Sequence, residues 1–306
     1  YDIAPKQESQ KFEVCVYEPD MDRLFERTKE LAEDIKNQFP KIQVMQMIVS
    51  HEKHHELYWN TNGTEFEQFA GAYHVIVEFS ANDGENTTSI DGADFYMKDL
   101  EHPLIELAGM KRQLADAEKQ LSVKPMEGKF EGTIVLTPGC LGGFLSAICR
   151  SFVSENVVLE KTSIWLDKLE KQVAEPRITI TLDPIHDGIV DYERYTSDGF
   201  VSEPFDLIRD GVLKSFLLPL YVANKSGMKP AKNLSRAVVM KAGDTPYEDM
   251  IKGIKKGLLL CGFSAGQPGT NGEISAVAKN SFLIEDGMVT DAVNEVMIAG
   301  NLAEML

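Results

Sequence analysis

The sequence predicts a mixed α+β fold, in which an antiparallel sheet with flanking helices precedes a β-rich, barrel-like C-terminal domain. Two helical patterns, at residues 21–39 and 104–121, bracket alternating apolar and polar runs between residues 42 and 79. Beyond Arg177, short strand patterns are separated by turn residues. With 306 residues, the chain is long enough for two domains.

The first half begins with a short strand at residues 13–17 and a helix that follows Pro19-Asp20. Apolar residues recur there at helical spacing up to Phe39, and Pro40 ends the pattern. Strands are expected at residues 42–49, 57–59 and 66–79, with a turn at Asn60–Gly63, and together they form an antiparallel meander.

A polar, glycine-containing loop is predicted at residues 81–94, before the second amphipathic helix at 104–121. Residues 124–128 have the composition of a linker. We therefore expect a first domain at residues 1–126 and a second at 127–306.

The second half opens with a strand at residues 132–136. Thr137-Pro138 then starts an unusually apolar helix that runs to Phe152, since proline suits the first turn of a helix. The remaining elements are strands at 178–182, 205–208 and 212–218, a helix at 247–260 that opens with a Thr245–Glu248 capping box, and a last hairpin that turns at Asp286-Gly287.

The charge balance argues against nucleic acid as a partner. The net charge is −17, whereas a DNA-binding surface must neutralise phosphates. No segment is long and apolar enough to cross a membrane, and the first ten residues do not have the pattern of a signal peptide. Four scattered cysteines indicate reduced thiols rather than disulfides, so a cytoplasmic protein is expected.

One segment matches a zinc-peptidase signature, His-Glu-x-x-His, at His51, Glu52 and His55. That signature requires a helix, because residues four apart then lie on one face about 5–6 Å apart. Here strand-like residues precede and follow the match, and on a strand the two histidines would lie about 13 Å apart. We expect a polar turn or strand with at most a weak, adventitious metal site that includes His54.

The C-terminal segment from Gly262 to Leu306 carries the most specific pattern. It combines a glycine-rich turn, a strand that ends at Glu285, the Asp286-Gly287 turn and a final run from Val296 to Leu302. This segment resembles the C-terminus of the TldD/PmbA family, peptidase-like proteins once called modulators of DNA gyrase. Shorter matches, in order along the chain, extend the resemblance from about Phe12 to Leu306.

The resemblance implies one of two kinds of subunit, of which one binds zinc through a His-Glu-x-x-x-His helix and the other (PmbA, also called TldE) does not. The corresponding stretch here, residues 137–150, contains no histidine and no acidic residue. Apolar residues stand at the degenerate motif positions: Leu141, Phe144, Leu145, Ile148 and Cys149. We therefore expect no catalytic residue, no metal ligand and no cofactor in this chain, with zinc only in a partner subunit.

Other nucleophiles and bases have structural interpretations. Cys140, Cys149 and Cys261 are expected to pack as small apolar side chains, because no histidine lies near them in sequence. His186 follows Asp183-Pro184, a segment that in the family leads into the central cleft. We expect a structural or peptide-contacting loop there.

The resemblance thus predicts a PmbA/TldE-like, non-catalytic subunit that pairs with a TldD-like peptidase and helps to bind unfolded peptides, with strand edges of the C-terminal domain available to the peptide backbone. Two alternatives remain open. One is an independent zinc metallopeptidase that uses His51, Glu52 and His55, and the other is a homodimeric peptide-binding protein. Relatives usually carry a further N-terminal α/β segment, which this sequence lacks.

Overall fold

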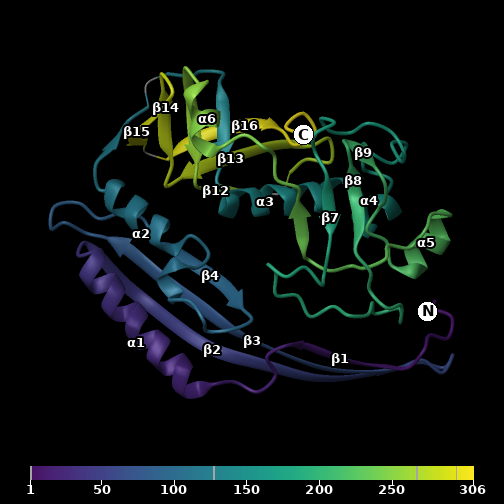
Figure 1. Cartoon of the computed structure of the whole chain (residues 1–306). Helices are drawn as coiled ribbons and strands as arrows, with labels where there is room; N and C mark the ends of the chain where they lie inside the picture. Colours follow the sequence, from purple (N-terminus) through teal and green to yellow (C-terminus); the bar gives the residue numbers. More distant parts are fainter. Residues whose placement is uncertain (1, 127, 267, 294) are drawn as a thin grey trace.

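The structure is a computed structural model that describes residues 2–126, 128–266, 268–293 and 295–306. Its first half is built on one long antiparallel hairpin, formed by β2 (Ile42–Trp59) and β3 (Glu65–Ala81). This hairpin forms a curved layer beneath the second half of the chain (Figure 1). The turn is closed by Asn60, whose side-chain oxygen accepts from the backbone N–H groups of Asn62 and Thr64.

Strand β3 has different partners along its second edge. Its first part pairs in parallel with β1 (Gln10–Cys15), and its second part pairs antiparallel with β4 (Asp91–Met97). Gly71 lies where β1 ends, and a Cβ atom there would approach the carbonyl oxygen of Val16 to 2.3 Å. A side chain at this position would therefore separate the two strands.

One face of this sheet is covered by helices. Helix α1 (Met21–Gln38) begins at Asp20, whose carboxylate accepts from Arg23 N at 2.9 Å, as an N-cap residue should. The 3-10 helix η1 (Leu104–Glu106) and α2 (Met110–Lys119) cover the same face. The buried core between them includes these side chains: Leu24, Leu31, Ile35, Val75, Val77, Phe79, Leu104, Met110 and Leu114.

The second half is dominated by short strands in three sheets. The sheet nearest the chain end has the strand order β12-β13-β16, the five-stranded sheet has the order β5-β15-β14-β11-β6, and a four-stranded sheet has the order β10-β7-β8-β9. Their bounds are β5 Val123–Lys124, β6 Thr133–Leu136, β7 Ile180–Leu182, β8 Phe205–Arg209, β9 Val212–Leu213, β10 Val238–Met240, β11 Lys256–Leu260, β12 Gly262–Ala265, β13 Glu273–Lys279, β14 Phe282–Glu285, β15 Met288–Val293 and β16 Val296–Asn301.

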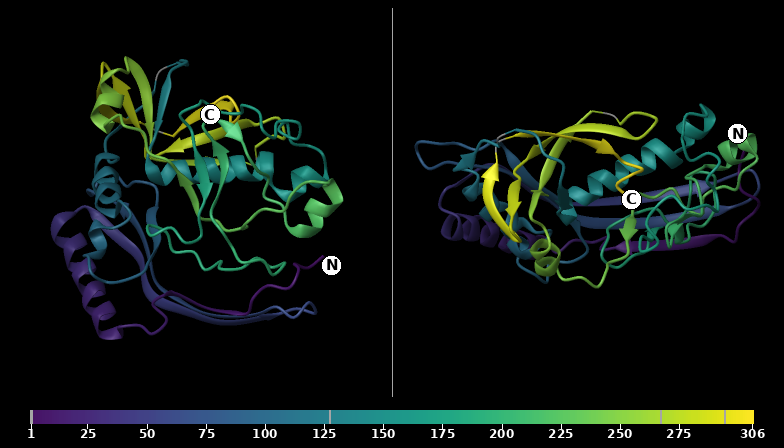
Figure 2. Two further views of the ribbon diagram at one scale, coloured as in Figure 1. Left: turned by 45° about the vertical axis from the view of Figure 1, so that its right-hand side comes forward. Right: turned by 90° about the horizontal axis from the view of Figure 1, so that it is seen from above.

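Helix α3 (Pro138–Ile148) lies among these sheets and continues into a π-helical turn, Cys149–Val153. Three shorter helices complete the chain: α4 Glu155–Leu159, α5 Leu220–Ser226 and α6 Tyr247–Lys252. The buried side chains of α3 belong to the same apolar core as those of β7, β8 and β11. The helix is therefore a central element of the second half (Figure 2).

The segment between β7 and β8 joins the two halves. Tyr195 packs against Phe12 and Phe66, with ring centroids 5.9 and 5.0 Å away. Gly199 has a φ of +93°, and a Cβ atom there would lie 2.4 Å from the Tyr58 hydroxyl. Only glycine tolerates both this backbone conformation and this close approach.

The mixed α+β class is confirmed, but the barrel-like C-terminal domain is not. Among the described residues no sheet closes on itself, since β6 and β16 each have only one neighbouring strand. The first sheet is also not a pure meander. Strand β1 is parallel to β3 because α1 and β2 intervene between them and reverse the chain twice.

Several element bounds differ from the predictions. Residues 91–94 of the expected loop belong to β4, where Ala93 is buried against α2. The helix expected at 104–121 is interrupted at Ala108 and Gly109, which have φ angles of +49° and +74°. The expected strand at 212–218 ends at Leu213.

The helix expected at 247–260 was the largest error. It ends at Lys252, and residues 256–260 form β11 between β14 and β6. The capping box is also wrong, because Pro246 occupies the N-cap position and no side chain caps the helix. In the expected linker at 124–128, Lys124 belongs to β5, whereas Glu127 lies outside the described residues.

Candidate functional site

Helix α3 confirms the prediction of an apolar helix after Thr137-Pro138. Its buried side chains are Cys140, Phe144, Leu145 and Ile148, while Leu141 and Cys149 are partly buried. Phe144 packs against Phe263 of β12, with ring centroids 4.6 Å apart. This face of the helix is therefore part of the hydrophobic core.

The residues of α3 do not fit a zinc ion. The helix offers no imidazole and no carboxylate, and its sulfur atoms belong to Cys140 and to Cys149 at its end. Burial raises the pKa of Cys140 to about 12 and that of Cys149 to about 11. Because zinc binds the thiolate rather than the thiol, these side chains are poor ligands at neutral pH.

Cys261 follows the same pattern, since burial raises the pKa of its thiol to about 12. It lies between β11 and β12 beside a cavity of about 660 Å³ at the start of α3. As with the other two thiols, packing accounts for its position, because none of the described residues that line the cavity is a histidine that could take its proton.

The zinc-signature match at His51, Glu52 and His55 lies in the middle of β2. Four residues along a strand separate the two histidines by about 13 Å. His51 Nε2 lies 2.7 Å from the carbonyl oxygen of Val16 and donates to it. His55 Nε2 lies 3.0 Å from a carboxylate oxygen of Glu67.

The alternation of side chains along β2 also separates His54 from His51 and His55. His54 points to the opposite face of the sheet, where its ring lies 5.4 Å from that of Tyr192. Among the described residues, no three side chains of the metal-ligating types come together in a group that could hold an ion. Each of the three histidines instead has a neighbour of its own.

His186 lies in an exposed loop, as expected. Its Nδ1 accepts from the backbone N–H of Gly188 at 3.0 Å. The loop is shaped by Arg194, whose guanidinium donates to the carbonyl oxygens of Pro184, Asp191 and Glu193. Burial lowers the pKa of Arg194, and these three acceptors compensate for the lost hydration.

Sequence reasoning missed a polar cluster on the sheet face that α1 and α2 leave open. His74 Nε2 lies 2.7 Å from Asp94, and its Nδ1 lies 3.5 Å from Glu52. The His74 ring also stacks on Tyr96 at 4.0 Å. These residues come from three different strands, so no local spacing could have indicated the cluster.

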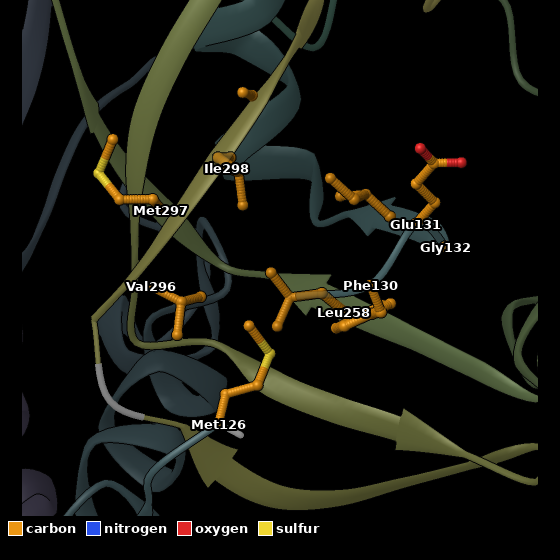
Figure 3. A pocket seen from close by; sticks show the side chains of 10 residues that line it. Met126, Phe130, Glu131, Gly132, Leu258, Val296, Met297 and Ile298 are labelled. Carbon is orange, nitrogen blue, oxygen red and sulfur yellow. The ribbon is translucent and has the colours of Figure 1, made fainter. Parts of the chain in front are cut away.

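A second feature that the sequence did not reveal is a groove between β6 and β16, with a cavity volume of about 270 Å³. Figure 3 shows Met126, Phe130, Leu258 and Val296 around a common space. Glu131 is the one charged side chain among the described lining residues. The groove is lined by Met126, Phe130, Glu131, Gly132, Ile134, Leu258, Val296, Met297, Ile298 and Ala299.

The groove lies close in sequence to α3, because β6 leads directly into this helix through Thr137. Ile134 of β6 is 37% exposed although its paired neighbour Leu258 is buried. Met297 of β16 is 69% exposed. Apolar surface is therefore accessible to solvent at the end of the buried core.

The second half matches a known protein family. Residues 128–306 match the model of the PmbA/TldA metallopeptidase C-terminal domain. This match includes α3, all strands from β6 onward and the lining of the groove except Met126.

Curated relatives include a metalloprotease from Methanothermobacter thermautotrophicus, 30% identical over 194 residues, or 60% of this chain and 42% of that protein. The metalloprotease PmbA of Escherichia coli O157:H7 is 31% identical over 153 residues, or 48% of this chain and 33% of that protein. The chain spans less than half the length of these two relatives.

Among solved structures, TldE from Thermococcus kodakarensis superposes with a TM-score of 0.86 at 22% sequence identity. The match covers 100% of this chain and 72% of that one. At this level of identity the similarity establishes the fold.

None of the helices in the described part of the chain is long and apolar enough to span a membrane.

Proposed function

Because the chain belongs to the PmbA/TldD metallopeptidase family, we propose that it is a PmbA/TldE-like, non-catalytic subunit. In this proposal it pairs with a TldD-like zinc peptidase and helps to bind unfolded peptide substrates. The zinc and the activated water belong to the partner subunit.

The observation that carries the proposal is the composition of α3. Phe144, Leu145 and Ile148 are buried in the core. They stand on the helix where the family resemblance leads us to expect the metal ligands of a catalytic subunit. A buried apolar face can neither hold a cation nor polarise a water molecule. The side chains of this helix therefore stabilise the fold and take no part in hydrolysis.

The alternative of an independent zinc peptidase has less support. Its ligands would be His51 and His55, which lie on an extended strand about 13 Å apart. The third interpretation, a homodimeric peptide-binding protein, has one observation in its favour. Strand β2 is an edge strand of 18 residues, and a second copy of the chain could pair with it.

The experiment is metal analysis of the purified chain, alone and after co-expression with a TldD-like subunit. We expect less than one-tenth of an equivalent of zinc in the isolated chain, and about one equivalent per heterodimer. Peptide cleavage should require the partner and should stop when a chelator is added. Chelator-sensitive cleavage by the isolated chain, abolished by His51→Ala, would refute the proposal.

Partner pairing has its own measurement. Sedimentation of the isolated chain and of the mixture distinguishes a heterodimer from a homodimer. A stable homodimer that does not exchange with the TldD-like subunit favours the homodimeric interpretation instead.

A further inference from the structure

The groove between β6 and β16 combines an apolar lining, an accessible strand edge and an unpaired carboxylate. We propose that it binds an extended peptide segment, which adds to the free edge of β16. One apolar side chain of the peptide enters the groove, and a neighbouring basic side chain pairs with Glu131. This inference rests on the proposed function, because it assigns the peptide-binding role to a specific place in this chain.

The groove is large enough for an apolar side chain. Its volume of about 270 Å³ lies below the roughly 300–1,000 Å³ of typical small-ligand pockets. Phe130, Ile134 and Leu258 provide apolar walls. Met126 and Met297 lie at its sides, and unbranched methionine side chains adapt to ligands of different shape.

The backbone of β16 provides the second element of recognition. This strand pairs with β13 through residues Val296–Asn301, and β13 is its one partner strand in the described part of the chain. The groove follows residues 296–299. Peptide N–H and C=O groups can therefore form a strand ladder there, while alternate side chains enter the groove or face solvent.

Charge supplies the third element. Glu131 is exposed and forms no hydrogen bond or ion pair with the residues that the structure describes. The Lys256 ammonium lies 4.7 Å from the centre of the neighbouring Phe130 ring. Glu131 therefore favours a lysine or arginine next to the apolar residue of the peptide, as does the net charge of −17.

The larger cavity beside Cys261 is a weaker candidate for this role. Its carboxylates already have partners, since Asp91 accepts from Asn280, Asp94 contacts His74 and Asp116 pairs with Lys119. It runs along residues 91–94 of β4, but among its described lining residues it leaves no carboxylate without a partner for a basic side chain. The groove beside β16 combines apolar surface, strand backbone and an unpaired carboxylate.

The test is fluorescence anisotropy of the full chain with a labelled, terminally blocked hexapeptide of alternating leucine and lysine. A matched peptide carries N-methyl groups on alternate amides, which block strand pairing and leave the side chains unchanged. We expect the N-methyl peptide to bind at least about tenfold more weakly, which corresponds to about 1.4 kcal/mol.

Two variants test the side-chain contacts. Ile134→Ser should weaken binding about tenfold, whereas the matched control Ile164→Ser, at a site 41% exposed and outside the groove, should not change it. Glu131→Lys should weaken binding of the lysine peptide and strengthen binding of the same peptide with glutamate in place of lysine. Glu160→Lys, another exposed glutamate, serves as its control.

The inference is overturned if the hexapeptide does not bind, if the N-methyl peptide binds equally well, or if neither groove variant changes affinity. It is also overturned if sedimentation shows a dimer that Ile134→Ser dissociates, because a second copy then occupies the groove. If peptide binding fails while the chain forms a zinc-dependent peptidase with its partner, the groove assignment is wrong and the proposed function stands. If the isolated chain holds its own zinc, the proposed function is wrong whatever the peptide does.

Discussion

A zinc site of the His-Glu-x-x-His type needs ligand side chains and a helical backbone. Residues 51–55 of β2 have the side chains, and α3 has the backbone. Residues 51–55 have histidines four apart, but the backbone is extended, so the two imidazoles lie about 13 Å apart. Helix α3 has the backbone that brings positions four apart onto one face, but those positions hold apolar side chains. Ligand spacing has chemical meaning only together with the secondary structure that carries it.

The largest expected effect tests whether α3 stabilises the fold as part of the hydrophobic core. Phe144→Ala should lower the free energy of unfolding by about 3–5 kcal/mol, because Phe144 is 4% exposed and packs against Phe263. Urea denaturation followed by circular dichroism measures this change. Ser146→Ala, on the exposed side of the same helix, should change stability by no more than about 0.5 kcal/mol. Equal losses in the two variants would contradict a packing role for Phe144.

The second prediction supplies α3 with the ligands that it lacks. In Gly142→His/Ser146→His, two imidazoles lie four residues apart on the exposed side of the helix, where a Cβ atom at position 142 has no neighbour within 4 Å. We expect Zn²⁺ at 100 times its dissociation constant to stabilise this variant by about 2.7 kcal/mol. Thermal unfolding with and without Zn²⁺ tests it.

The wild-type chain, with His51 and His55 intact, is the matched control for this double variant. Its melting temperature should not rise at the same Zn²⁺ concentration. A similar rise in both proteins would mean that β2 binds the ion in spite of its extended backbone.

A smaller effect distinguishes His51 from His55, two of the three histidines of β2. His51→Ala should cost about 1 kcal/mol, because a partly buried hydrogen bond to Val16 is lost. His55→Ala should cost no more than about 0.5 kcal/mol, because its contact with Glu67 is exposed to solvent. Denaturation at pH 7 gives both values, and the reverse order would show that His55 has a role beyond this contact.

The smallest effect concerns pH. Burial raises the pKa of Asp91, although Gly92 and Asn280 donate to its carboxylate. The folded chain therefore binds this proton more tightly than the unfolded chain, so stability falls as pH rises from about 4 through the raised pKa of Asp91.

Asp91→Asn removes this titration. The variant should lose less stability than the wild type between pH 4 and neutral pH, as measured by thermal unfolding at a series of pH values. Glu8→Gln, at an exposed position, should follow the wild-type profile. A steeper profile for Asp91→Asn would show that the carboxylate contributes more through its hydrogen bonds than it costs through burial.

The reliable sequence signals were local ones. Helix α1 was predictable because a cap residue precedes a continuous apolar stripe, and α3 because proline follows the strand exit. Strand β11 was not predictable, because Leu258–Leu260 continue the apolar pattern of the helix expected at 247–260. They form a strand through pairing with β14 and β6. The parallel pairing of β1 also depends on a partner that lies more than fifty residues away.

The candidate site divides in the same way. The absence of histidine and acidic side chains on α3 follows from fourteen consecutive residues, 137–150. The groove could not, because its lining residues come from segments around residues 130, 258 and 297, which meet only in the folded chain. Likewise, Glu52, His74 and Asp94 come together only because β2, β3 and β4 are neighbours in one sheet.

The unpaired edge of β2 has a consequence for the behaviour of the protein at high concentration. An edge strand of 18 residues with exposed Met45 and Trp59 is a template for uncontrolled polymerisation. The charges of Glu52, Lys53 and Glu56 interrupt this edge and oppose such growth. High ionic strength would screen these charges, so we expect aggregates to form sooner at high salt concentration than in dilute buffer.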